Sequence, residues 1–263
     1  MSLVLVLFLS MILPALAVTS HESIGERIIG GDKAFAGQFP FIAAIYKNTN
    51  DGIFFCGGAL MNDQWILTSG YCVDGAVLFT IYLGAHYLNE DEPSRVRLAT
   101  DFYILHPEYN PLTLENDIGL IQLRMPVTFT TYIKPINYLP YYHLEPNTAG
   151  IMTMGWGQTS DDTPGIVDEL HYVHLIPISN EECKLSFGSQ IVDTMVCAGG
   201  NFNEGFCRGD TGTPLVRFSN GPVTTHMGIA SFISKNGCDT PEPSGYTRTY
   251  PYVDWIRNVT DIA

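Results

Sequence analysis

Short runs of β-branched and aromatic residues recur along this chain and constrain its fold more than any other feature. Each run is a few residues long and lies between glycine, proline, asparagine or aspartate residues, which end strands and form turns. This spacing predicts an all-β barrel or sandwich of antiparallel strands rather than a parallel sheet with crossover helices. The predicted strands cover Phe41–Tyr46, Ile53–Phe55, Trp65–Thr68, Val77–Leu83, Ile118–Leu123, His171–Ile176 and Met227–Ile233.

One helix is expected, at the C-terminus. Four apolar residues there fall at positions i, i+3, i+4 and i+7 and would form one stripe against the core. They are Tyr252, Trp255, Ile256 and Val259.

The first 17 residues have the pattern of a secretory signal peptide. The segment from Leu3 to Ala15 is almost unbroken apolar sequence, and Ala15-Leu16-Ala17 offers small residues at the two positions that a signal peptidase recognises. A membrane anchor is the alternative, but about 15 apolar residues are short for a helix that spans a bilayer. We therefore predict a secreted, extracellular protein that is cleaved near Ala17.

Cysteine content and charge narrow the class of protein further. Six cysteines in an oxidising compartment predict three disulfides, although the sequence alone allows about 15 pairings. No ligand spacing typical of a metal site is present, so we expect no metal and no cofactor. The 27 acidic and 13 basic residues give a net charge of −14, which disfavours nucleic-acid and membrane-surface partners.

Ordered sequence blocks run along the chain from Arg27 to Arg248. The blocks are Arg27-Ile28-Ile29-Gly30-Gly31, Phe55-Cys56-Gly57-Gly58-Ala59-Leu60, Trp65-Ile66-Leu67-Thr68, Asn116-Asp117-Ile118-Gly119-Leu120, Gly155-Trp156-Gly157, Cys197-Ala198-Gly199-Gly200, Gly209-Asp210-Thr211-Gly212-Thr213-Pro214-Leu215 and Gly245-Tyr246-Thr247-Arg248. From Ile28 to the C-terminus these blocks resemble the trypsin/chymotrypsin family of serine proteases, and the sequence of residues 171–180 resembles that of arthropod digestive members.

The resemblance implies two antiparallel six-stranded β-barrels with an active site between them, followed by the C-terminal helix. Together with the signal peptide predicted over 1–17, it implies a propeptide over 18–27 and a trypsin-like domain over 28–263. Activation would cut between Arg27 and Ile28 and pair the freed ammonium with Asp210. The implied disulfides are Cys56–Cys72, Cys183–Cys197 and Cys207–Cys238.

The catalytic positions of the family are altered in this chain. A serine protease needs a hydroxyl nucleophile, an imidazole base and a carboxylate that orients the imidazole. Here the three positions hold Thr211, Tyr71 and Asp117, so only the carboxylate is kept. A tyrosine is a weak base because only about one phenol in a thousand is ionised at neutral pH. Gly209 is retained, and its N–H with that of Thr211 is suited to an oxyanion hole.

The substrate pocket implied by the resemblance is altered as well. Gly205 at its base carries no charge, and Thr213 replaces a second glycine after the nucleophile. We expect Ile233 to plug the pocket, since it replaces a glycine at the mouth. The residues assigned to the pocket are Gly205, Ser231, Phe232, Ile233 and Ser244.

Two further sites are weaker candidates. An acidic run, Asn89-Glu90-Asp91-Glu92, lies in the family's calcium loop, but that loop would draw ligands from Ala85, Tyr87 and Arg95, which cannot bind calcium. We expect a solvated acidic loop there. Asn258 begins an N-glycosylation sequon in the predicted helix.

These substitutions predict a secreted protein with a degenerate triad that is not an enzyme. It would act by binding protease inhibitors, proteases or their polypeptide substrates. The alternative is an active serine-type endopeptidase-like hydrolase that uses Thr211 as nucleophile, in a medium alkaline enough to ionise Tyr71. A structural or storage protein without a specific partner is a third class.

Overall fold

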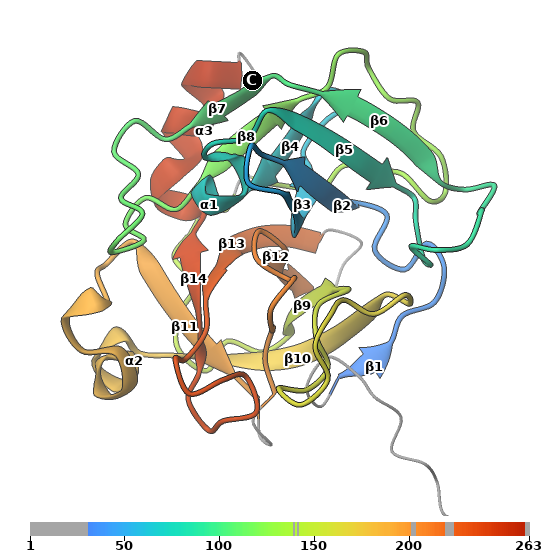
Figure 1. The fold of residues 1–263 in the computed structure, drawn as a ribbon. Coiled ribbons are helices and arrows are strands. Elements are labelled where there is room, and N and C mark those ends of the chain that lie inside the picture. The colour runs from blue at the N-terminus through green and yellow to red at the C-terminus, as the bar shows by residue number, and fades with distance from the viewer. Residues whose placement is uncertain (1–30, 139, 141, 201–203, 219–223, 261–263) are drawn as a thin grey trace, which may run out of the picture.

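The structure is a computed structural model that describes residues 31–138, 140, 142–200, 204–218 and 224–260. The predicted signal peptide, the propeptide and the activation residues Arg27 and Ile28 lie outside the described residues. The described chain forms two antiparallel sheets packed against each other, one above the other in Figure 1.

The first sheet is built from the N-terminal half of the chain. Its core holds large apolar side chains that alternate along the strands, such as Ile45, Leu60, Ile66, Phe79 and Ile81. The strand order is β6 (Val96–Thr100), β5 (Leu78–Leu83), β2 (Ile42–Asn48), β3 (Ile53–Leu60), β4 (Trp65–Thr68), β8 (Gly119–Gln122) and β7 (Tyr103–Leu105).

The second sheet closes on itself. Its strand order is β1 (Asp32–Lys33), β10 (His171–Ile178), β11 (Met195–Gly199), β14 (Ser244–Arg248), β13 (Thr224–Phe232), β12 (Pro214–Phe218) and β9 (Ile151–Gly155). Because β9 also pairs with β10, six of these strands form a barrel. Its core includes Leu215, Phe206 and Tyr246.

The predicted fold class is confirmed, with two differences in detail. Each sheet has seven strands rather than six, and among the described strands only the second sheet shows a closing pair. The additional strand of the second sheet is β1, which pairs with His171 and Tyr172 at the start of β10. Strand β10 is long enough to pair with two strands along one edge. His171 and Tyr172 pair with β1, and the last three residues of β10 pair with β11.

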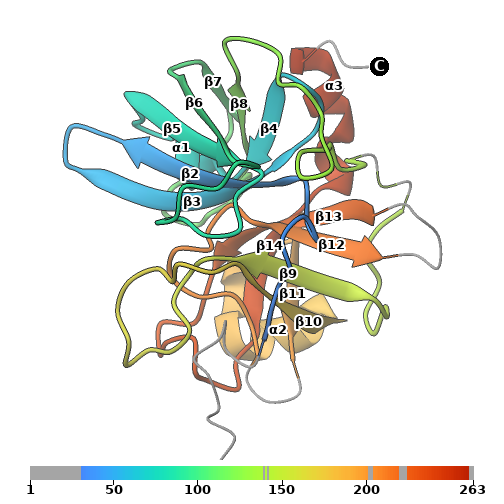
Figure 2. The ribbon, with the colours of Figure 1, turned by 90° about the vertical axis from the view of Figure 1, so that its right-hand side faces the viewer.

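The helices are short and lie outside the sheets. They are α1 (Gly70–Val73), α2 (Asn180–Phe187), α3 (Val253–Thr260) and the 3₁₀ helices η1 (Gly188–Gln190) and η2 (Tyr250–Tyr252). The predicted C-terminal helix is confirmed as α3, which buries Ile256 against Trp65 and Leu67 of the first sheet. In Figure 2 this helix lies beside β4. The chain therefore leaves the second sheet after β14 and ends against the first sheet. None of the described helices is long and apolar enough to cross a membrane.

Three disulfides tie loops to this framework: Cys56–Cys72, Cys183–Cys197 and Cys207–Cys238. These are the pairings expected from the family resemblance. In the chain-entropy model each loop of this length gains about 3 kcal/mol of stability from its bridge.

Candidate active site

An open cleft with a volume of about 650 Å³ lies where residues of both sheets meet. Tyr71, Gly209, Thr211 and Ser231 all line it, so the structure brings these four predicted residues together. Asp117 lies behind them and is fully buried.

The backbone of Tyr71 is fixed by two hydrogen bonds. Tyr71 stands in the first turn of α1, a helix that starts because the Ser69 side chain accepts the N–H of Cys72. The N–H of Tyr71 donates to Asp117 Oδ1 at 2.8 Å, and its carbonyl accepts from Lys47 Nζ at 2.7 Å. The ring is 43% exposed and faces the cleft, with Lys47 Nζ 5.0 Å from its centroid.

Asp117 therefore holds the peptide of residue 71 rather than its side chain. Its second oxygen accepts from Ser231 Oγ at 2.5 Å, which ties it to β13. Burial raises the pKa of Asp117 to about 6, although these hydrogen bonds act in the opposite direction.

Thr211 and Gly209 lie on a loop whose backbone is held from both sides. The carbonyl of Thr211 accepts from the N–H of Gly57 at 2.8 Å, and the N–H of Gly212 donates to Ala230 O at 2.8 Å. Gly209 has a φ of +100°, which a residue with a side chain rarely adopts. In the part of the chain that the structure describes, the N–H groups of Gly209 and Thr211 have no acceptor. Both are available for an oxyanion in the cleft.

The Asp210 carboxylate is buried beneath this loop and meets only backbone N–H groups. Gly157 donates to Oδ1 at 2.7 Å and Cys207 donates to Oδ2 at 3.1 Å. A Cβ atom on Gly157 would lie 2.3 Å from Asp210 Oδ2, so the close approach requires glycine. Burial raises the pKa of Asp210 to about 7, since no described cation approaches it.

The predicted substrate pocket is nearly filled. Gly205, Ile233 and Ser244 surround a cavity of about 10 Å³, which is room for about one water molecule. Ile233 packs on the Cys207–Cys238 disulfide, and Ser244 Oγ donates to Ala198 O at 3.1 Å. The other two assigned residues lie elsewhere, because Ser231 lines the open cleft and the ring of Phe232 packs on Phe187.

Thr213 takes the place of a second glycine after the nucleophile. Its side chain is buried beneath the loop, with Oγ1 3.4 Å from Thr153 Oγ1, so it does not project into the cleft.

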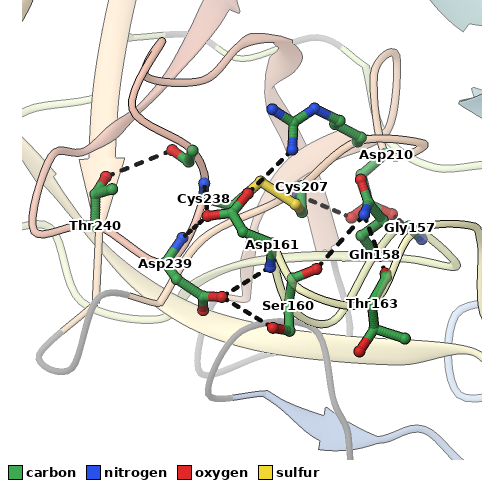
Figure 3. The surroundings of a disulfide bond; sticks show 12 residues. Gly157, Gln158, Ser160, Asp161, Thr163, Cys207, Asp210, Cys238, Asp239 and Thr240 are labelled. Carbon is green, nitrogen blue, oxygen red and sulfur yellow. Dashed lines mark hydrogen bonds and ion pairs between the residues drawn. A yellow bond between two sulfur atoms is a disulfide. The ribbon is translucent and has the colours of Figure 1, made fainter.

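Two carboxylates that sequence reasoning missed join the loops around the Cys207–Cys238 disulfide (Figure 3). Asp161 Oδ2 accepts the N–H groups of Cys238 and Asp239, each at 2.8 Å, and Asp161 Oδ1 accepts from Arg208 Nη1 at 3.0 Å. Asp239 Oδ2 in return accepts from the backbone of Asp161 at 2.8 Å and from Ser160 Oγ. No motif marks these residues, because only the fold brings the two loops together.

Histidine does not replace the missing base in the described chain. Of the seven histidines, His21 lies outside the described residues and none of the other six lines the cleft. The ring of His106 lies 4.9 Å from that of Trp255, and burial lowers its pKa.

The remaining candidate sites have local explanations. Arg95 Nη1 donates to the carbonyls of Tyr87 and Leu88, so a guanidinium occupies the loop where the family places calcium. Asp161 lies near the sulfur atoms of Cys207 and Cys238, but both sulfurs belong to a disulfide and are not free to ligate a metal. Asn258 is exposed on α3.

Comparisons with known proteins agree with this geometry. A family model described as Trypsin matches residues 28–256, and the chain therefore belongs to the trypsin family. Brachyurin from Leptuca pugilator is 36% identical over 235 residues, which are 89% of this chain and 99% of that protein. Chymotrypsin-like elastase family member 1 from Bos taurus is 30% identical over 262 residues, 97% of each chain. A solved structure of HL collagenase is 31% identical with a TM-score of 0.80, covering 90% of this chain and 100% of that one.

These relatives correct one expectation from the sequence. We predicted from Tyr71 and Thr211 that the chain is not an enzyme, and this prediction is wrong. Proteins named as elastase and collagenase match almost the whole chain, which points to an enzyme. Tyr71 and Thr211, at the base and nucleophile positions, therefore need an explanation that is compatible with catalysis.

Proposed function

We propose that this protein is a secreted endopeptidase-like hydrolase in which Thr211 is the nucleophile and the ionised phenol of Tyr71 is the base. The observation that carries the proposal is one open cleft that contains both side chains and the free N–H groups of Gly209 and Thr211. The enzyme names of the relatives support it further.

The reaction follows the logic of acyl transfer. The Thr211 hydroxyl attacks a peptide carbonyl and gives its proton to the Tyr71 phenolate, which then protonates the leaving amine. The developing oxyanion accepts hydrogen bonds from Gly209 and Thr211. A water molecule, deprotonated in the same way, then hydrolyses the Thr211 ester and restores the hydroxyl. Asp117 and Lys47 act by holding the backbone of residue 71.

The activity should be slow at neutral pH. In a triad enzyme the loss of nucleophile or base costs about six orders of magnitude in turnover. Since the phenolate fraction grows about tenfold for each pH unit below the pKa of a phenol, turnover should rise steeply with pH.

The closed cavity restricts the substrate. Around Gly205, Ile233 and Ser244 there is no space for a large side chain, so the residue facing them should be glycine or alanine. Polypeptide inhibitors that present an extended segment should occupy the same cleft.

Maturation belongs to the same proposal. Residues 1–17 would be removed on secretion and 18–27 on activation, with the Ile28 ammonium then pairing with Asp210. Glycosylation at Asn258 is proposed on its exposed position in the sequon.

Hydrolysis of alanine-rich peptides by the mature protein tests the proposal. Products should form faster at about pH 10 than at about pH 7, and Thr211→Ala should remove them at both. Product formation by Thr211→Ala at the wild-type rate would mean that the activity comes from a contaminant or another residue.

A further inference from the structure

Asp161 joins three loops of the second sheet around the Cys207–Cys238 disulfide. These are the loops between β9 and β10, between β11 and β12, and between β13 and β14. Asp161 belongs to the first of them. Its Oδ2 accepts the N–H groups of Cys238 and Asp239, each at 2.8 Å, and its Oδ1 accepts from Arg208 Nη1 at 3.0 Å (Figure 3). One carboxylate therefore bonds to both of the other loops.

The contact between the first and third loops is built for a carboxylate. A Cβ atom on Gly237 would clash with Asp161 Oδ2, so the close approach requires glycine. The N–H of Asp239 is the main cause that lowers the pKa of Asp161, against the effect of burial. The N–H of Cys238 and the Arg208 guanidinium lower this pKa further. Asp161 is therefore ionised at neutral and alkaline pH.

The oxyanion donor Gly209 shares a peptide group with Arg208. The carbonyl of Arg208 and the N–H of Gly209 belong to one planar trans peptide, in which they point in opposite directions. The N–H of Gln158 donates to this carbonyl at 2.8 Å. The hydrogen bond from Gln158 therefore sets the direction of the Gly209 N–H.

Gly209 does not fix this peptide group by itself. A glycine at a φ of +100° has several backbone conformations open to it, so the peptide can rotate unless its surroundings hold it. Asp161 holds the Arg208 side chain against the loop that carries Gln158. The Arg208 and Asp161 side chains are 57% and 27% exposed, so their ion pair adds little stability. Its effect is on position.

We infer that Asp161 is a positioning residue for the reaction proposed above. By binding Arg208 and the loop between β13 and β14, its carboxylate keeps the N–H of Gln158 on the Arg208 carbonyl. The Gly209 N–H then stays directed at the oxyanion. The inference rests on the proposed function for the role of Gly209. Asp161 does not line the cleft, so it acts through Arg208 and not by touching the substrate.

Steady-state kinetics with alanine-rich peptides test the inference. Removing one oxyanion donor costs about 100- to 1,000-fold in kcat, because such donors act mainly in the transition state. Asp161→Ala misdirects the donor without removing it. We therefore expect kcat at about pH 10 to fall by about tenfold or more, while KM changes by less than about twofold. Asp101→Ala removes an exposed ion pair with Arg124 outside the cleft and should keep both constants. An unchanged kcat, or a change confined to KM, would overturn the inference.

Amide hydrogen exchange, followed by NMR, gives a second readout that needs no turnover. The N–H of Gln158 is bonded to Arg208 and not to Asp161. If Asp161 holds the loops together, this N–H should exchange at least about tenfold faster in Asp161→Ala. Asp101→Ala should leave the exchange as in wild type. Wild-type exchange at Gln158 in a folded Asp161→Ala protein would overturn the inference.

Asp161→Asn keeps the inference testable if Asp161→Ala does not fold. Its amide keeps an oxygen for the backbone N–H groups but loses the ion pair with Arg208. We expect kcat to fall by about threefold, with the free energy of unfolding nearly unchanged. Lower stability with an unchanged kcat, in either variant, would make Asp161 a structural residue only and overturn the inference. If wild-type protein cleaves nothing, the proposed hydrolysis fails, and exchange at Gln158 alone decides whether Asp161 holds the peptide group.

Discussion

The backbone of residue 71 is held more firmly than its side chain. Asp117 accepts its N–H and Lys47 donates to its carbonyl, while the ring lies open to the cleft. A change confined to the ring therefore leaves these hydrogen bonds in place. Substitutions at this residue should report on chemistry rather than on folding.

Exchanging Tyr71 is expected to change the pH dependence of hydrolysis in a defined way. Tyr71→Phe should reduce turnover to background, because the ring keeps its packing but loses the proton acceptor. Tyr71→His should bring the rise in turnover down to near neutral pH, since an imidazole titrates there. Rates measured from about pH 6 to about pH 10 check both. Wild-type rates for Tyr71→Phe would eliminate the phenol as base.

At the scale of single residues, the sequence predicted positions better than contacts. The motifs placed Tyr71, Thr211 and Gly209 at one site because the backbone path follows the motif. They did not predict that Asp117 meets the N–H of Tyr71 or that the Thr213 side chain points inward. The direction of a side chain depends on partners from distant loops, and these are absent from a local pattern.

Elements were predictable where their burial is strong. The runs that became β2, β4, β5 and β10 are apolar enough to stand out, whereas β6 is largely exposed and shows no such run. Helix α2 was missed although Ser179 and Glu182 have capping-box spacing, and Ser179 Oγ does accept the N–H of Glu182. The sequence shows no apolar stripe that would predict this helix, because Cys183 is its only buried residue.

Ile233, just beyond the end of β13, sets the size of the closed cavity. Ile233→Gly should open it, so that peptides with phenylalanine facing it bind at least about tenfold better. Alanine peptides should change little. Ile176→Gly on β10 is a matched control away from the cavity, since it removes a half-exposed strand isoleucine. Affinities for the two peptide types in the Thr211→Ala background measure the effect. If phenylalanine peptides gain nothing, another residue fills the cavity.

At the scale of the whole molecule, two sheets meet around a cleft and a buried carboxylate lies under the loop between them. The family resemblance predicted this architecture because many blocks occur in the family's order along the chain. It also placed the active site between the barrels, and Ile233 led us to expect a plugged pocket. It did not predict the volume of the cleft or of the cavity, since these volumes depend on how side chains from both sheets pack.

Buried Asp210 should make stability depend on pH. Its pKa is about 7 in the folded protein and its ordinary value is 3.8, so the folded state binds more protons between these values. Stability from this group therefore falls as pH rises through that window, by at most about 1.4 kcal/mol per pH unit. The free energy of unfolding of wild type relative to Asp210→Asn should decline from about pH 4 to about pH 7 in denaturant titrations. A flat difference would show that Asp210 is ionised throughout. In protein cleaved after Arg27, pairing with Ile28 should abolish the decline.

The proposal that Thr211 is a nucleophile is tested most directly by covalent labelling. The mature protein is treated with a small fluorophosphonate from about pH 7 to about pH 10, and the modified residue is mapped by mass spectrometry. We expect a label on Thr211 that forms faster as pH rises, forms faster still in Thr211→Ser, and is absent in Thr211→Ala. A folded wild-type protein that carries no label on Thr211 at any pH would contradict it.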